Sequence, residues 1–175
     1  MRFMDSIVSN QLILSIKDQF QLNWNGIHGV SHWARVYENG LQLAESSGAN
    51  KKVVRLFALF HDSQRLNESL DPDHGPSGAR LAELLRGKLL DLPDEEFDLL
   101  FTACNLHTLA KSHEDITVQT CFDADRLDLG RVGKIPNPKF LCTEGAKDPN
   151  MIEWANQRSI SGYVPDNILG RAYQP

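Results

Sequence analysis

The most constraining feature of this sequence is the stretch Val53 to Arg65, which reads VVRLFALFHDSQR. It predicts a helix that is apolar on nearly every side, and such a helix is buried. The helix ends in the polar pair His61-Asp62. A buried carboxylate and imidazole lose their hydration, so hydrogen bonds, an opposite charge or a metal ion must compensate the loss. An exposed helix end would suit His61 but not Asp62, because the helix dipole disfavours a carboxylate there.

Two other segments offer partners for this pair. His32 lies near the start of a helix expected from about Ser31 to Ser46, and the segment DADRLD (123–128) places three carboxylates close together. These residues alone leave two interpretations of that segment open. In the first, one carboxylate points inward as a metal ligand. In the second, all three carboxylates form a solvated face and pair with Arg126. A histidine, a His-Asp doublet and a distant aspartate are nitrogen and oxygen donors that divalent transition metals accept.

The remaining pattern predicts an all-α chain, because almost no segment alternates between apolar and polar residues. Further helices are expected over residues 4–21, 116–131 and 148–159. A fourth helix is expected to start at Asp73 or His74 and to carry a stripe of leucines at 81, 84, 85, 89 and 90. A fifth is expected to start at Asp94 and to end between residues 107 and 111. Asn50 and Asp94 are the expected N-caps of the central and fifth helices. Pro76 fits the first turn of the fourth helix.

Length and charge limit the classes of protein. A chain of 175 residues fits one domain, here expected over 1–175 with a loop-rich extension over 132–175. The net charge of −5 argues against broad binding of nucleic acid or membrane surfaces. Three widely spaced cysteines favour a reduced, cytoplasmic protein. Neither a signal peptide nor an apolar run of about 20 residues is found, so no membrane span is expected.

The order and context of the polar residues resemble the HD-domain superfamily of metal-dependent phosphohydrolases. The resemblance covers residues 28–131 and rests on SHWARV, LFHDSQR and DADRLD. It implies an all-α fold of about six to eight helices and a divalent metal that activates water against a phosphoester. The metal ligands that it implies are His32, His61, Asp62 and Asp125. The Ala-Asp-Arg-Leu context selects Asp125 over Asp123.

Three other histidines have candidate roles. His74 in DHGPSG and His107 in NLHTLA resemble the extra histidines of relatives that bind two metals. The alternative is that His74 helps to cap a helix and His107 ends one. His28 is a candidate to support the ligands or to contact substrate, and His113 is expected at the surface.

The expected ligand set is compatible with manganese, iron, cobalt, nickel or zinc and does not choose among them. A metal with an open coordination position lowers the pKa of bound water and polarises a phosphoryl oxygen. Arg35, Arg65, Arg126 and Lys111 are candidate phosphate contacts. Each of these four cations, taken singly, is better explained as an ordinary solvated or ion-paired surface charge.

The leading hypothesis is a metal-dependent phosphohydrolase of a small phosphorylated molecule, a nucleotide among the candidates, with Asp62 orienting or deprotonating the attacking water. A second hypothesis is a di-iron oxygenase of the same superfamily, in which His74 and His107 complete six ligands. A third is a non-catalytic helical module that binds a metal or nucleotide. The resemblance places the loops that shape the substrate pocket at 66–76, 108–118 and 132–147. It leaves the oligomeric state open, with a homodimer as one option.

Overall fold

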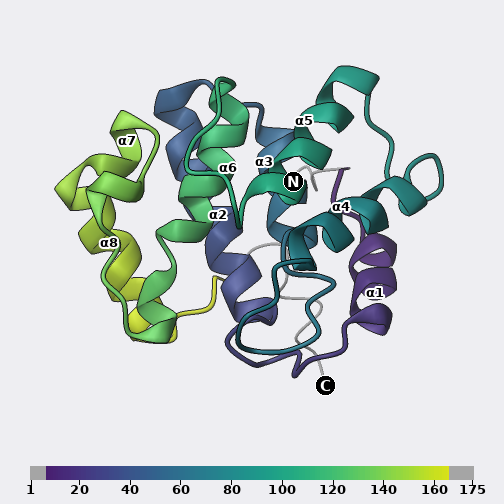
Figure 1. The fold of residues 1–175 in the computed structure, drawn as a ribbon, viewed down its shortest axis with the longest axis horizontal. Helices are drawn as coiled ribbons and strands as arrows, with labels where there is room; N and C mark the ends of the chain where they lie inside the picture. The colour runs from purple at the N-terminus through teal and green to yellow at the C-terminus, as the bar shows by residue number, and fades with distance from the viewer. Residues whose placement is uncertain (1–6, 166–175) are drawn as a thin grey trace, which may run out of the picture.

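The computed structural model describes residues 7–165, and its regular structure is helical. In chain order the elements are α1 (Asn10–Gln19), α2 (Val30–Ser47), α3 (Lys51–Phe60), α4 (His74–Leu85), α5 (Asp94–Leu106), α6 (Ile116–Arg126), the 3-10 turns η1 (Leu129–Val132) and η2 (Pro138–Phe140), α7 (Glu144–Lys147) and α8 (Pro149–Ile160) (Figure 1). The only β feature among the described residues is an isolated bridge between Arg86 and Leu90. The all-α prediction is confirmed.

Helix α3 is the centre of the packing. It contacts α1, α2, α4, α5 and α6, and its residues from Val53 to Phe60 are buried except Arg55. The Asn50 side chain accepts hydrogen bonds from the backbone N–H groups of Lys52 and Val53, at 3.0 and 3.3 Å. The sequence correctly predicted both the burial of this helix and its cap, and the burial carries into the His61-Asp62 pair at its end.

Helices α2 and α6 lie together beside α3, and the C-terminal helices pack on their far side (Figure 1). The Asn39 side chain of α2 donates to the carbonyl oxygen of Ala124 in α6 at 3.1 Å. A second, smaller core joins α2 and α6 to α7 and α8; its buried members are Leu43, Leu127, Leu141, Ala146 and Ala155. Residues 149–160 are helical, as the pattern predicted.

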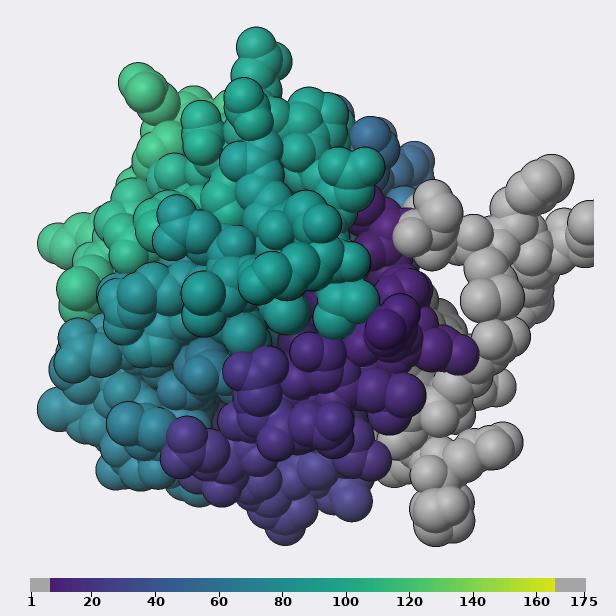
Figure 2. Space-filling view, turned by 90° about the vertical axis from the view of Figure 1, so that its right-hand side faces the viewer, coloured from purple at the N-terminus to yellow at the C-terminus, as the bar shows by residue number. Residues whose placement is uncertain are grey.

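Helices α4 and α5 form an antiparallel pair on the other side of α3, next to α1 (Figures 1 and 2). Two glycines let the start of α4 approach its neighbours. A Cβ at Gly78 would lie 2.2 Å from the carbonyl oxygen of Phe60, and a Cβ at Gly75 would lie 2.6 Å from that of Cys104. This close packing brings His74, the first residue of α4, to the end of α3.

Several expected boundaries were wrong. Helix α4 ends at Leu85 because Gly87 turns the chain with φ +74°; Leu84 is 65% exposed and Leu90 folds back into the core. Pro93 rather than Asp94 occupies the N-cap of α5, and Asp94 pairs with Arg86 instead. Helix α6 ends at Arg126, where a 3-10 turn replaces its expected last turn.

The first helix begins at Asn10 behind a Ser9 cap, and the part of its expected range before residue 7 lies outside the described residues, as does the tail from residue 166. No helix in the described range has the length and apolar character that crossing a membrane requires.

Candidate metal centre

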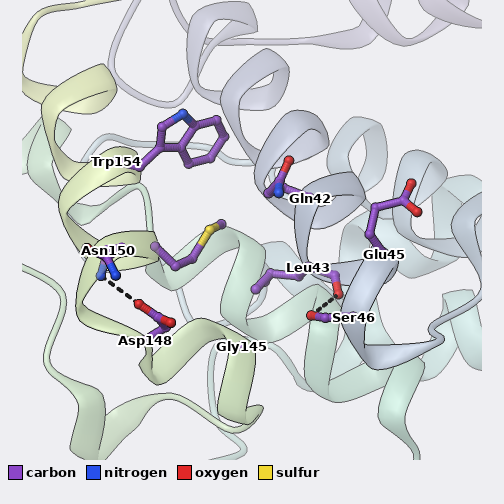
Figure 3. Close-up of a pocket in the computed structure, with 9 residues that line it drawn as sticks. Gln42, Leu43, Glu45, Ser46, Gly145, Asp148, Asn150 and Trp154 are labelled. Carbon is purple, nitrogen blue, oxygen red and sulfur yellow. Dashed lines mark hydrogen bonds between the residues drawn. The ribbon is translucent and has the colours of Figure 1, made fainter.

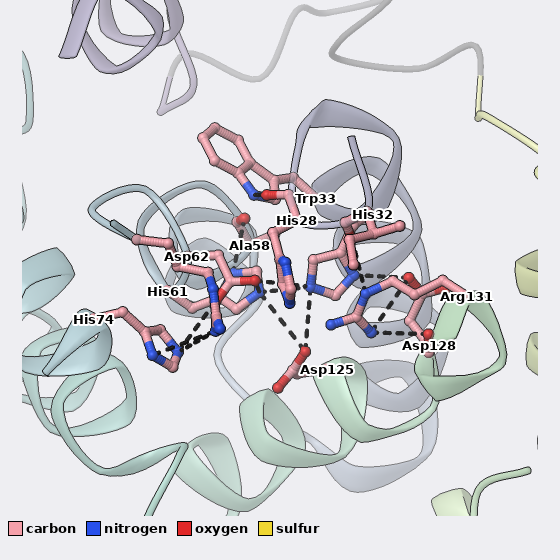
Figure 4. A network of polar contacts seen from close by, with 12 residues as sticks. His28, His32, Trp33, Ala58, His61, Asp62, His74, Asp125, Asp128 and Arg131 are labelled. Atoms are coloured by element: carbon pink, nitrogen blue, oxygen red, sulfur yellow. Dashed lines mark hydrogen bonds and ion pairs between the residues drawn. The ribbon is translucent and has the colours of Figure 1, made fainter. Parts of the chain in front are cut away.

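The four residues expected to bind a metal meet in one buried cluster at the end of α3. The Nε2 atom of His32 lies 3.0 Å from Nε2 of His61, 3.4 Å from Oδ2 of Asp62 and 3.3 Å from Oδ1 of Asp125. The Nε2 atom of His61 lies 3.7 Å from both of those carboxylate oxygens. The donors come from α2, the turn after α3, and α6 (Figure 4). Residues far apart along the chain therefore converge as the sequence predicted.

A second group of donors adjoins the first and shares Asp62 with it. The Oδ1 atom of Asp62 lies 3.1 Å from Nε2 of His74, which in turn lies 3.1 Å from Nε2 of His107. One carboxylate thus faces the pair His32 and His61 with Oδ2, and faces His74 with Oδ1. The two groups, His32-His61-Asp62 and Asp62-His74-His107, each gather their donor atoms within 4.8 Å.

The orientation of the four imidazole rings fits metal binding. Each Nδ1 atom contacts an acceptor: Asp128 for His32, the carbonyl oxygens of Phe57 and Ala58 for His61, Asp71 for His74, and Cys104 for His107. Because a carbonyl oxygen only accepts, its partner Nδ1 must carry the proton, which leaves the lone pair of a neutral ring on Nε2. Two Nε2 lone pairs about 3 Å apart require a proton or a metal ion between them.

Charge interactions in the cluster oppose the effects of burial. Burial lowers the pKa of His61 to about 3, although Asp62 and Asp125 act in the opposite direction. Burial also lowers the pKa of His32, but hydrogen bonds to Asp125, Asp128 and Asp62 raise it to about 9 overall. Burial raises the pKa of Asp62, yet His61, His32 and His74 hold it well below its usual range. At neutral pH the site therefore offers ionised carboxylates and a neutral His61.

Sequence reasoning did not single out Asp128, which the structure places directly behind His32. The Oδ2 atom of Asp128 lies 2.7 Å from Nδ1 of His32, and Arg35 donates to both of its oxygens at 2.6 and 3.2 Å. Arg131, another unexpected residue, approaches Asp128 to 3.9 Å. The available signal was spacing: Asp128 follows Asp125 by three residues, as Arg35 follows His32, and residues three apart would share a face of the helix expected over 116–131.

Two of the expected phosphate contacts are placed elsewhere. The guanidinium of Arg35 is buried against Asp128 and the carbonyl oxygen of Tyr163, where it supports His32. Lys111 is exposed, and its backbone oxygen accepts from Arg126. His28 is buried beside the cluster and bonds to Glu68, with its ring centroid 6.4 Å from that of His32.

The carboxylates of DADRLD divide into different roles. Asp123 points away from the cluster and accepts hydrogen bonds from the backbone N–H groups of Cys142 and Thr143 and from the Thr143 hydroxyl. Asp125 faces the histidines, as described above. The expected alternative of a solvated acidic face is therefore wrong, because Asp123 and Asp128 are fully buried.

A cavity of 270 Å³ opens onto this cluster. Its lining consists of Asp62, Arg65, His74, His107, Thr108, Asp125, Arg126 and Arg131. Arginines thus face the carboxylates and histidines across a small polar space. A larger hollow of 590 Å³ lies between α2 and α8, with Trp154 and Gln42 at its sides (Figure 3). No histidine lines that hollow, so the chemistry is concentrated at the end of α3.

Comparison with known proteins agrees with this geometry. No protein-family model and no curated protein matches the chain. A solved structure is similar: the predicted HD superfamily hydrolase from an uncultured Thermotogales bacterium, with 27% sequence identity, 87% of each chain covered and a TM-score of 0.65. The comparison supports a hydrolase of that superfamily. The all-α fold and the His, His-Asp, Asp cluster of this chain are thus those expected of an HD superfamily protein, and the chain is similar to one.

Proposed function

We propose that this protein is a metal-dependent phosphohydrolase that cleaves a phosphoester of a small phosphorylated molecule. One observation carries the proposal: the His32-His61-Asp62 cluster lies beside a cavity whose lining combines Asp62 and Asp125 with three arginines. Nitrogen and carboxylate donors suit a divalent metal, and guanidinium groups suit phosphate oxygens. A divalent metal would satisfy the carboxylates, and a negatively charged substrate would satisfy the arginines.

His32, His61, Asp62 and Asp125 would hold the metal, which could be manganese, iron, nickel, cobalt or zinc. When bound in such an open site, a divalent ion lowers the pKa of water and polarises a phosphoryl oxygen. The protein supplies the orientation of its donors: the backbone carbonyls at Phe57 and Ala58 fix the ring of His61.

Asp62 is the proposed catalytic residue because its two oxygens face different partners. Oδ2 faces His32 and His61, whereas Oδ1 lies next to His74 and lines the cavity. Its lowered pKa keeps the carboxylate ionised at neutral pH. An ionised carboxylate at the cavity wall can accept a hydrogen bond from the attacking water and orient it.

The arginines contribute charge from separate elements. Arg65 follows the end of α3 and lies 3.6 Å from Asp62, Arg126 ends α6, and Arg131 belongs to η1. All three line the cavity. Arg65 and Arg126 were expected phosphate contacts, whereas Arg131 was not. Spread around the space, they can bind a phosphoryl group from more than one side.

The experiment is an assay of phosphate release from phosphomonoesters and nucleotides after loading with each candidate metal. Asp62→Asn should reduce kcat/KM by roughly 100-fold or more, in line with the loss of a general base. Asp98→Asn changes an exposed carboxylate of α5 and serves as the matched control. Full activity of Asp62→Asn would falsify the proposed role. Nucleotide binding without turnover under every metal would instead identify a non-catalytic module.

The second cluster supports another candidate, a di-iron oxygenase. His74 and His107 join Asp62 in a group of their own, and with His32, His61 and Asp125 they bring the number of possible ligands to six. Two irons per chain with oxygen consumption would establish this activity. Phosphate release with a redox-inactive ion such as zinc, and no oxygen uptake after iron loading, would exclude it.

A further inference from the structure

Several exposed apolar side chains belong to segments that adjoin the cavity, either in the chain or through hydrogen bonds to its arginines. We call this set the apolar collar: Ile27, Leu66, Leu70, Leu109, Val132 and Phe140. Leu70 is 86% exposed, Leu109 72% and Phe140 68%. Other exposed large apolar side chains, among them Leu14 on α1, Leu84 on α4 and Ile135, do not follow or precede a residue that lines the cavity.

Chain continuity ties half of the collar to the cavity. Leu66 follows Arg65, Leu109 follows Thr108, and Val132 follows Arg131. Each of these preceding residues lines the cavity. The collar therefore begins where the cavity wall ends.

Hydrogen bonds from the cavity arginines hold the other loops in place. Arg131 donates to the carbonyl oxygen of Ile27 at 2.9 Å, and Arg126 donates to that of Phe140 at 2.9 Å. Arg65 donates to the carbonyl oxygen of Ser69, beside Leu70, at 2.6 Å. The groups that face the substrate's charge also position the apolar loops around it.

The cavity is large enough for a phosphate group but too small to enclose a large substrate. Its volume of 270 Å³ lies below the range of about 300–1,000 Å³ typical of pockets that enclose a drug-sized ligand. Its lining is almost wholly charged or polar. The part of a substrate that exceeds this volume lies outside the cavity, where the collar residues offer apolar contact.

We propose that the substrate is an amphiphilic phosphate monoester, with its phosphate in the cavity and its apolar body on the collar. This inference rests on the proposed phosphohydrolase function. Exposed apolar groups beside a polar pocket are typical of a binding surface, and the arginines match a phosphate head. A second copy of the chain could also cover apolar loops, but it would not account for their attachment to the cavity arginines.

The test uses ethyl, butyl, hexyl and octyl phosphate below their micelle-forming concentrations, with glycerol 3-phosphate as a hydrophilic reference. KM should fall roughly two-fold per methylene, less than the about four-fold expected for complete burial. The value of kcat should change little, because the collar contacts the ground state and the transition state equally. Leu109→Ser and Phe140→Ser should flatten this dependence on chain length. Leu84→Ser, which changes a similarly exposed leucine of α4, should leave it unchanged.

The outcomes separate this inference from the proposed function. Equal kcat/KM for all alkyl phosphates, or preference for glycerol 3-phosphate, would overturn the apolar collar as a substrate site while the phosphohydrolase stands. A collar variant that changes the mass of the particle in solution but not the chain-length dependence would also overturn it. If these esters are not cleaved but a nucleotide or another phosphomonoester is, the collar inference fails and the phosphohydrolase stands; if no phosphoester of either assay is cleaved, the proposed function fails. Calorimetric titration with octylphosphonate against methylphosphonate then decides the collar by itself, since tighter binding of the longer chain supports it and equal binding overturns it.

Discussion

The Nδ1 atom of His32 lies 2.7 Å from Oδ2 of Asp128, a residue 96 positions later in the chain. Arg35 holds the same carboxylate from the other side with two hydrogen bonds. The ring of His32 is therefore fixed between Asp128 and the cluster, with Nε2 facing His61 (Figure 4). A carboxylate bound to the distal nitrogen of a histidine orients the ring and makes it a stronger metal ligand.

Replacing Asp128 should weaken metal binding without touching a ligand. For Asp128→Asn we expect the metal affinity to fall roughly 10- to 100-fold, the usual effect of removing such a supporting partner. Competition against a chromophoric chelator measures it. Asp98→Asn, on the exposed face of α5, should bind as the unaltered protein does. An unchanged affinity in Asp128→Asn would show that His32 needs no support.

The sequence predicted most of the helices because a buried helix can be recognised from the apolar residues within it. In α3 the apolar residues and the Asn50 cap both indicate a buried helix that starts after residue 50, and the structure has both features. The boundaries that were wrong depend on single backbone positions. Leu84 and Leu90 share a leucine pattern, yet Gly87 ends the helix between them, and the two side chains have opposite exposure.

The site was predictable only as far as its order along the chain. His32, His61, Asp62 and Asp125 stand in recognisable local contexts, whereas Asp128 looks like one acid among three. Which carboxylate faces inward depends on how α6 is rotated against α2, and a contact between distant residues fixes that rotation. The hydrogen bonds of Arg126 and Arg131 to backbone carbonyls could not be predicted either. Every residue has a backbone carbonyl, so the sequence does not show which one accepts.

Variants of the neighbouring carboxylates Asp123 and Asp125 should change different properties: stability for Asp123 and metal binding for Asp125. Asp125→Asn removes a charge that faces His32 and His61, so we expect the metal affinity to drop at least tenfold, in proportion to a lost ligand. Asp123→Ala removes the acceptor of three hydrogen bonds to Cys142 and Thr143. It should lower the free energy of unfolding by about 2–4 kcal/mol while metal binding persists. Chelator competition and urea unfolding measure the two effects, and equal effects in both variants would contradict the assignment.

The shared position of Asp62 predicts the number of metal ions. If both clusters bind, His107→Leu should remove one of two ions per chain, because it takes one donor from the Asp62-His74-His107 group only. Elemental analysis after loading and gel filtration gives the stoichiometry. His113→Leu, which alters a histidine outside both clusters, is the matched control. A single ion in the unaltered protein, retained in His107→Leu, would restrict binding to the first cluster.

Metal binding should release a proton from His32. Burial lowers the pKa of His32, but its three aspartate partners raise it to about 9, so the metal-free ring is protonated at pH 7. A metal ion binds only the unprotonated nitrogen, and its apparent affinity should therefore rise up to about tenfold per pH unit as the pH approaches 9. Calorimetry at pH 7 in buffers with different ionisation enthalpies counts the protons released. No dependence on the buffer would show that the ring is already neutral.

The metal-free protein should be most stable near pH 6.5, the ordinary pKa of histidine, and less stable on either side. The pKa of His32 is raised in the folded state, so its stabilising charge is present below pH 6.5 and is lost as the pH rises towards 9. Burial lowers the pKa of His61 to about 3, so below pH 6.5 the unfolded chain takes up a proton that the folded one refuses, and stability falls again. Each group changes the free energy of unfolding by at most about 1.4 kcal/mol per pH unit.

Urea unfolding of chelator-treated protein between pH 5 and 9 measures the profile. Saturating metal should remove the decline above pH 6.5, because the metal replaces the His32 proton. A metal-free profile that rises steadily to pH 9 would mean that His32 is not held by its three carboxylates.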